Sequence, residues 1–292
     1  MTTTRPPTTT TRALVLGGTG KSGRRVAQQL RRRGTPVRLG SRSGLPPFAW
    51  HDRRTWEPVL DGVDAAYLAY APDLAVAGAV EVVEAFTALA VDRGVRRVVL
   101  LSGRGEPGAL AAERAVRAAA AAAGAACTVV RSSWFMQGFS EDAFLEPVLA
   151  GELALPVGDV PEPFVDVEDV AEVAVAALTA AGHEGRVYEV TGPEPLTFAA
   201  VAQRIAAACG RPVAFRSVAP DDFAATLAAS GAPPEAVELM AFLFTEVLDG
   251  RNARVADGVQ QALGRAPRSF TDFARAAAAS GAWSPRTAVV DR

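Results

Sequence analysis

The stretch ALVLGGTGKSG, residues 13–23, joins a short apolar run to a glycine-rich loop. The run Ala13–Leu16 has the length of a buried strand, and the residues from Ser22 onward follow a helical pattern. Between a strand and a helix, glycines allow a tight turn and let backbone amides approach a pyrophosphate, which the helix N-terminus stabilises. The loop satisfies both GxxGxxG and GxGxxG. It therefore predicts a dinucleotide site formed by Gly17, Thr19, Gly20, Lys21, Ser22 and Gly23.

The Gly-Lys-Ser of this loop also suggests a P-loop of the form GxxxxGK[ST]. That motif requires glycine at position 15, where this chain has Val15. A nucleotide triphosphatase is therefore disfavoured.

The segment that follows the second expected strand indicates which dinucleotide is bound. An acidic residue there binds the ribose 2′-hydroxyl of NAD, whereas an arginine accommodates the 2′-phosphate of NADP. Residues 39–43 read LGSRS, without an acid. Ser41 and Arg42 therefore predict NADP(H) as the cofactor. Asp52, expected at the end of a third strand after Phe48 and Trp50, could contact the adenine; its alternative role is a helix cap.

Along the chain, short β-type runs alternate with helical patterns at the spacing of βαβ units. The predicted fold class is α/β, a Rossmann-type doubly wound parallel sheet with a smaller, mostly helical C-terminal substrate lobe. The expected strands are 13–16, 37–39, 65–69, 98–101, 127–130 and 187–190. The expected helices are 22–33, 75–93, 110–123 and 168–179, with three or four more between residues 197 and 279.

The same patterns predict the domain organisation. Residues 1–11 are expected to be a disordered head and residues 284–292 a disordered tail. Residues 12–155 would form the NADP-binding domain and residues 156–283 the substrate lobe. Because the expected helix 168–179 and strand 187–190 belong to the main sheet, the lobes should interleave.

Composition excludes several classes of protein. The 292 residues are 49% hydrophobic and carry a formal charge of −2, so the chain can build a large core and has no basic stripe for nucleic acid. Two separated cysteines and two separated histidines give neither a disulfide framework nor a metal site. No apolar segment is long enough for a signal or a membrane span, which favours a cytoplasmic protein. Lys21 is the only lysine.

In open α/β sheets, ligands gather beyond the carboxyl ends of the strands. Tyr70 and Ser102 each follow an expected strand, and we consider both as cofactor-binding and catalytic candidates. Ser102 could hydrogen-bond a substrate or the nicotinamide carboxamide, or only satisfy a strand end. Tyr70 could donate a proton, or only pack beside Pro72.

Aromatic residues follow the next strand. They would form an apolar wall for a flat or polycyclic molecule, although aromatics at such spacing also occur in cores. The predicted substrate pocket comprises Trp134, Phe135, Met136, Gln137, Phe139 and Phe244. The segment Phe244–Asn252, which combines acids with Arg251, could be a lid or an interdomain clasp.

Four stretches, GGTGKSG at 17–23, GSRS at 40–43, VRSSWF at 130–135 and VDVEDV at 165–170, carry a family resemblance. Over about residues 12–283 the chain resembles the NmrA-like branch of the atypical short-chain dehydrogenases/reductases. Within that branch it is similar to bacterial relatives of the ergot-alkaloid reductases. The resemblance implies NADPH-dependent reduction of an iminium bond, and quinone reductases and cofactor-sensing regulators share the fold.

Two departures from the wider superfamily affect the chemistry. Tyrosine-dependent members use a YxxxK pair, but none of Tyr67, Tyr70 and Tyr188 has a lysine four residues later. The asparagine that is common near the end of the WFxxN-like segment is replaced by Gly138. The usual proton relay is therefore absent from this chain.

Three function classes remain. The favoured one is an NADPH-dependent reductase of a small organic substrate (an iminium or imine, a quinone or a ketone), in secondary metabolism. An iminium is already cationic, so hydride addition needs no proton donor. The alternatives are a non-redox isomerase or cyclase and an NADP(H)-sensing regulator, which would not need the aromatic wall. The expected partner is a small molecule, and a homodimer is compatible with the sequence.

Overall fold

The computed structural model describes residues 12–284, which form two compact units that interleave along the chain. The first unit comprises residues 12–102, 108–130 and 171–187, and the second comprises residues 103–107, 131–170 and 188–284. The expected boundary at residue 155 falls inside the second unit. The head 1–11 and, apart from Ser284, the tail lie outside the described residues.

A six-stranded sheet has the order β2-β1-β3-β4-β5-β7. The pairs β1–β2, β1–β3 and β3–β4 are parallel, with Leu16 opposite Gly40 at the β1–β2 edge. This sheet confirms the predicted Rossmann-type α/β class and all six of its expected strands. The strands are β1 (Ala13–Leu16), β2 (Val37–Gly40), β3 (Ala65–Leu68), β4 (Arg97–Gly103), β5 (Ala126–Ser132) and β7 (Val187–Val190).

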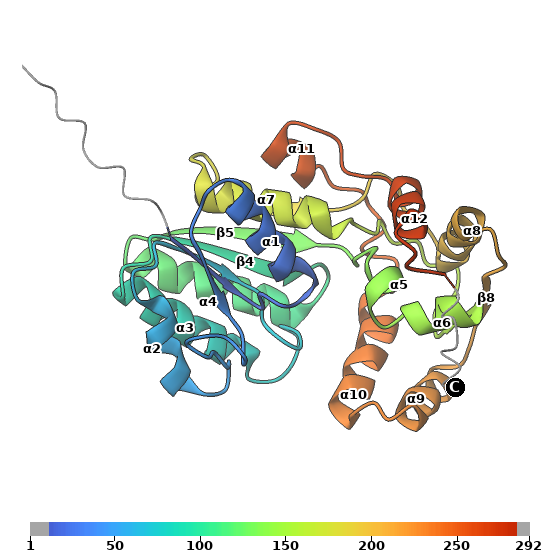
Figure 1. Ribbon diagram of the computed structural model, residues 1–292. Coiled ribbons are helices and arrows are strands. Elements are labelled where there is room, and N and C mark those ends of the chain that lie inside the picture. Colours follow the sequence, from blue (N-terminus) through green and yellow to red (C-terminus); the bar gives the residue numbers. More distant parts are fainter. Residues whose placement is uncertain (1–11, 285–292) are drawn as a thin grey trace, which may run out of the picture. The chain divides into compact units, whose positions relative to one another are not determined.

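Helices cover both faces of this sheet (Figure 1). Helices α2, α3 and α4 share one buried apolar cluster with β1, β3 and β4, whereas α1 and α7 lie on the opposite face. The helix expected to begin at residue 75 is α3, which begins at Ala79, directly after Gly78 with its positive φ. The helix expected to begin at residue 110 is α4, which begins earlier, at Pro107. The elements are α1 (Lys21–Arg32), η1 (Arg53–Thr55), α2 (Trp56–Leu60), α3 (Ala79–Asp92), α4 (Pro107–Ala122) and α7 (Val167–Thr179).

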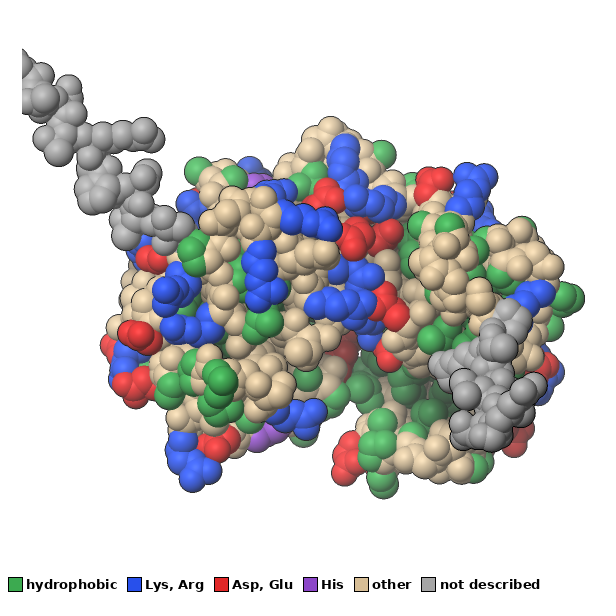
Figure 2. All heavy atoms as spheres, viewed as in Figure 1, with side chains coloured by type: hydrophobic (Ala, Val, Ile, Leu, Met, Phe, Trp, Pro, Cys, Tyr) green, Lys and Arg blue, Asp and Glu red, His purple; other side chains and the backbone are tan. Residues whose placement is uncertain are grey.

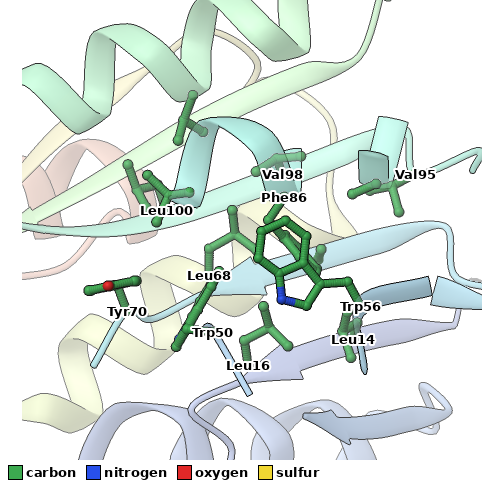
Figure 3. Close-up of a cluster of buried hydrophobic side chains, with 14 of the residues drawn as sticks. Leu14, Leu16, Trp50, Trp56, Leu68, Tyr70, Phe86, Val95, Val98 and Leu100 are labelled. Atoms are coloured by element: carbon green, nitrogen blue, oxygen red, sulfur yellow. The ribbon is translucent and has the colours of Figure 1, made fainter. Parts of the chain in front are cut away.

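The apolar cluster of the first unit is built around aromatic side chains (Figure 3). Phe86 of α3 is fully buried, and the rings of Phe48, Trp50 and Trp56 surround it at centroid distances of 5.4–5.5 Å. Such edge-to-face contacts favour a single arrangement of the rings. The segment between β2 and α2 therefore anchors itself to the sheet through its side chains.

The expectation of a strand that ends at Asp52 was wrong. Residues 46–50 have no regular structure, and Ala65–Leu68 is the third strand of the chain. The apolar residues Phe48 and Trp50 suggested a strand, but the adjacent Pro46 and Pro47 lack the N–H groups that a ladder needs. Apolar character here reflects core packing and not strand pairing.

The second unit contains a small parallel sheet, β6 with β8, that the sequence patterns did not predict. The strand β8 is mostly exposed, so it has no apolar run. The region 197–279 also holds more helices than the three or four expected. The elements are α5 (Gly138–Glu141), α6 (Leu145–Ala150), β6 (Glu152–Leu155), α8 (Phe198–Cys209), β8 (Ala214–Ser217), α9 (Pro220–Ala229), α10 (Pro234–Phe242), the π-helix η2 (Leu243–Val247), α11 (Gly258–Leu263) and α12 (Phe270–Ala279).

Asp169, in the first turn of α7, fixes the loop before α12. Its carboxylate is fully buried and accepts hydrogen bonds from Arg265 Nη2 at 2.7 Å and from the Arg268 backbone N–H at 2.7 Å, and it also contacts the Arg268 guanidinium. A buried charge needs such compensation. The loop is therefore tied to α7 by charge.

Arg104, in the turn after β4, is the centre of a second buried network. Its guanidinium donates to Ser133 Oγ at 3.1 Å and to the carbonyls of Asn252 and Arg254 at 3.0 and 3.1 Å. It also approaches Glu189 at 3.5 Å. These hydrogen bonds hold together segments that lie 148 and 150 residues apart in sequence.

Glu162 belongs to the same network. Burial raises the pKa of this carboxyl to about 7, against the opposing effects of the Arg104 charge and of hydrogen bonds from Ser133 and the Trp134 backbone. One carboxyl oxygen, Oε1, is buried and has no hydrogen-bond partner among residues 12–284. Because the fold disfavours the charged form, Glu162 costs stability once it ionises.

We predict that Glu162→Gln stabilises the protein more at pH 8 than at pH 5. In the wild type the folded pKa lies above the usual value of 4.5, so stability is lost as pH rises from about 4.5 through 7. The difference in unfolding free energy between variant and wild type should grow by about 2–3 kcal/mol from pH 5 to pH 8. Urea unfolding at both pH values measures it.

The exposed Glu152, paired with Arg216, provides the control, because its pKa is lowered and Glu152→Gln should show no such growth in this range. Equal differences for Glu162→Gln at pH 5 and pH 8 would contradict the raised pKa.

Candidate functional site

The glycine loop between β1 and α1 forms a closed turn. Gly17 has a φ of +65°, and the Gly20 backbone N–H donates to the Gly17 carbonyl at 2.9 Å. A Cβ on Gly23 would lie 2.2 Å from the Gly17 carbonyl oxygen. The first turn of α1 therefore packs directly against the loop, and only glycine fits at position 23.

The N-terminus of α1 is suited to an anion. No side chain of the described residues caps this helix, and its first turn holds no acidic residue. The first backbone N–H groups of a helix have no intrahelical acceptor and carry a partial positive charge. Ser22 is buried in this turn and Lys21 is half-buried. The loop can therefore hold the pyrophosphate of a dinucleotide.

A hollow of about 510 Å³ lies beside the glycine loop along β2. Thr19, Leu39, Ser41 and Ser43 are among its lining residues. Arg42 is exposed between the two serines, and its guanidinium makes no hydrogen bond or ion pair within the described part of the chain. The loop after β2 thus offers the hydroxyls of Ser41 and Ser43 and the guanidinium of Arg42, which are groups that bind a phosphate.

The predicted role of Asp52 at the adenine competes with a structural one. Its carboxylate accepts from Arg54 N at 3.1 Å and from Arg54 Nε at 2.9 Å, which caps η1. These hydrogen bonds to Arg54 lower the pKa of Asp52. The helix-cap alternative is therefore what the structure shows.

Tyr70 follows β3 and has a buried hydroxyl without a partner within the described residues. The centroid of its ring lies 5.2 Å from that of Trp50 (Figure 3) and 6.2 Å from that of His51. Burial raises the pKa of the phenol, so the hydroxyl stays protonated at neutral pH. An unpaired buried hydroxyl costs free energy unless a ligand satisfies it.

Ser102, near the end of β4, is also buried. Its Oγ donates a hydrogen bond to Glu113 Oε1 of α4 at 2.7 Å. Glu113 was not among the site residues predicted from the sequence. The available signal was a single acidic residue within an otherwise apolar helical stripe.

The predicted substrate residues divide into two groups. Trp134 and Phe135 are half-buried, and Trp134 contacts Phe244 at a centroid distance of 5.2 Å. Met136, Phe139 and Phe244 lie in the core of the second unit. A smaller exposed aromatic surface than expected therefore remains for a substrate.

Gln137 has a structural contact. Its amide nitrogen donates to Asp166 at 2.7 Å, and its amide oxygen accepts from the Val167 backbone at 2.9 Å. Asp166 in turn accepts from the Glu168 backbone at 2.8 Å. Gln137 thus helps to fix the start of α7.

The segment Phe244–Asn252 is held within the second unit. Besides the bond from Arg104 to its carbonyl, Asn252 donates through Nδ2 to the Arg104 carbonyl at 3.3 Å. Gly105 lies so near that a Cβ there would be 2.2 Å from Asn252 Nδ2. Arg104, the arginine between Gly103 and Gly105, fixes this segment, and no local sequence pattern links it to a residue 148 positions later.

The described residues contain no group of three or more His, Cys, Asp or Glu arranged to hold a metal ion. Among the same residues, no helix has the length and apolarity needed to cross a membrane. Acidic and basic side chains are interspersed on the face shown in Figure 2.

Comparison with known proteins places this geometry in context. No protein-family profile matches the chain. The chain is 35% identical over 285 residues to the (4-alkanoyl-5-oxo-2,5-dihydrofuran-3-yl)methyl phosphate reductase of Streptomyces griseus, covering 89% of this chain and 95% of the relative. It is 32% identical over 287 residues to festuclavine dehydrogenase of Aspergillus fumigatus, covering 89% and 96%. It is 31% identical over 290 residues to the NAD(P)H azoreductase of Xenophilus azovorans, covering 91% and 98%.

Solved structures share the fold. An NADPH-dependent quinone oxidoreductase of Escherichia coli complexed with NADPH superposes with a TM-score of 0.75 at 19% identity, covering 90% of this chain and 98% of that one. The triphenylmethane reductase of Citrobacter sp. complexed with NADP(H) superposes with a TM-score of 0.72 at 18% identity, covering 91% of this chain and 99% of that one. Relatives above 30% identity over nearly the whole length, together with the glycine loop and this sheet, show that the chain belongs to the NmrA-like branch of the atypical short-chain dehydrogenases/reductases.

Proposed function

We propose that the protein is an NADPH-dependent reductase of a small, flat organic substrate with an electrophilic C=N or quinone group. The observation that carries the proposal is the glycine loop with an uncapped α1, followed after β2 by Ser41 and Arg42 without an acid. The relatives named above support it, because they are a dehydrogenase and two reductases.

The residues present fit NADP(H). The backbone amides at the start of α1 would bind the pyrophosphate, and Arg42 with Ser41 would bind the 2′-phosphate. The Tyr70 hydroxyl, which has no partner in the described part of the chain, could donate a hydrogen bond to the cofactor or the substrate. Bound NADPH would supply a hydride to the electrophilic atom of the substrate.

The side chains available for proton transfer favour a substrate that needs no strong acid. The chain has no YxxxK pair, and the Ser102 hydrogen is directed at Glu113. An iminium carbon that accepts a hydride becomes an amine carbon without taking up a proton. A reduced quinone can take its proton from water, whereas a ketone requires a donor for its developing alkoxide. Trp134 and Phe135 retain exposed ring surface, which suits a flat substrate.

A panel assay tests the function. NADPH oxidation, followed by absorbance, is measured with cyclic iminium salts, quinones and ketones, and we expect the highest kcat/KM with an iminium or a quinone. Gly20→Val is the control, because a Cβ there meets only the Gly17 carbonyl at 3.2 Å, so the variant should fold but not bind the cofactor. Tight NADPH binding without turnover of any substrate class would contradict the proposal.

Arg42→Ala should weaken NADPH binding by roughly 10- to 150-fold and leave NADH binding unchanged, because a charge-assisted hydrogen bond is worth about 1.5–3 kcal/mol. Calorimetric titration of both cofactors measures this. Arg31→Ala, an exposed arginine in the last turn of α1, should change neither affinity. Equal affinities of the wild type for NADPH and NADH would reject the role of Arg42.

Tyr70→Phe and Ser102→Ala should each lower kcat by about tenfold or less on an iminium or a quinone. Removing a general acid typically costs about 10²–10⁴-fold, and no such acid is needed for these substrates. Steady-state rates on the best substrate measure the effect. A loss of about a thousandfold in either variant, with cofactor affinity intact, would make that residue the acid.

A further inference from the structure

Helix α4 buries one charged residue inside an apolar stripe. Ala109, Ala112, Val116 and Ala120 form its buried face, and Glu113 lies on the same face with 3% of its surface exposed. A carboxylate is rarely buried in such surroundings, because its desolvation costs free energy.

The contact between Glu113 and Ser102 orients a hydroxyl. Ser102 Oγ lies 2.7 Å from Glu113 Oε1, and Ser102 is also 3% exposed. Ser102 is the donor and Glu113 the acceptor of this hydrogen bond, so the hydroxyl hydrogen of Ser102 points at Glu113. The distance is that of a well-formed O–H···O hydrogen bond, and both groups are shielded from water.

The orientation determines what Ser102 can offer a ligand. With its hydrogen directed at Glu113, the hydroxyl presents oxygen lone pairs to any other partner. Ser102 lies near the carboxyl end of β4, at the sheet edge where ligands bind in this fold. The complementary group on a ligand is an N–H or O–H donor.

We propose that Glu113 is a positioning residue that sets Ser102 as a hydrogen-bond acceptor for the carboxamide N–H of the nicotinamide ring. The inference rests on the proposed cofactor and deepens it. It assigns Ser102 to recognition of the ring and not to proton donation. Ser102 Oγ would accept a hydrogen bond from the amide nitrogen of the cofactor. The carboxamide oxygen cannot take this place, because it can only accept hydrogen bonds.

A double-mutant cycle on cofactor affinity tests the proposal. The dissociation constant of NADP⁺ is measured by calorimetry for wild type, Ser102→Ala, Glu113→Leu and the double variant. Each single change should weaken binding by about two- to tenfold, the range for a neutral hydrogen bond, and the double variant should be no weaker than Ser102→Ala. Leucine fills the apolar site without a cavity, which protects the fold.

A cofactor analogue separates positioning from structural damage. The 3-acetylpyridine analogue of NADP⁺ carries a methyl group in place of the carboxamide nitrogen, so it has no N–H for Ser102. Ser102→Ala and Glu113→Leu should leave its affinity unchanged. Glu113→Gln, whose amide oxygen still accepts from Ser102, should bind NADP⁺ almost as the wild type does, and Arg114→Ala, exposed on the same helix, should have no effect.

Two results would overturn the assignment: losses in NADP⁺ affinity that multiply in the double variant, or equal losses with the analogue. Absence of any NADP⁺ binding by the wild type would instead reject the proposed function itself. The two failures are therefore distinguishable.

Discussion

The packing of α1 against its preceding loop is the constraint on which the first unit depends. A Cβ at position 23 would lie 2.2 Å from the Gly17 carbonyl, and one at position 40 would lie 2.2 Å from Leu16 Cδ2. These absent side chains let the helix, the loop and β2 come together at the end of β1. The same closeness leaves the helix amides accessible to a phosphate, so one steric requirement underlies both the fold of this unit and the proposed cofactor site.

The second unit depends on buried charge in addition to its aromatic core. Arg104 joins the turn after β4 to the carbonyls of residues 252 and 254, and Asp169 joins α7 to the loop before α12. Breaking a buried pair is costly, so such contacts fix one arrangement of segments. Glu162 differs from these stabilising charges. Its charged form is disfavoured by burial, and one of its oxygens has no partner among the described residues.

The sequence predicted those features that arise from local physics. Apolar runs identified all six strands of the main sheet, and glycine spacing identified the loop. It did not predict contacts between elements that meet only when the chain packs. Arg104 and Asn252 are 148 residues apart. Ser102 and Glu113 are 11 residues apart, but their contact depends on how α4 packs against β4. The strands β6 and β8 were missed because β8 is largely exposed, and Trp50 suggested a strand where it serves the core. Phe139 and Met136 belong to the core of the second unit. The sequence suggested a pocket for them because aromatic residues at this spacing occur both in pockets and in protein interiors.

The proposed reaction moves a hydride from NADPH to an electrophilic carbon of the substrate. NADPH deuterated at the transferring C4 position is supplied with a cyclic iminium substrate, and the product is analysed by mass spectrometry and NMR. We expect one deuterium per product molecule, on the carbon of the former C=N bond. Product formed without deuterium from the cofactor, in ordinary water, would contradict it.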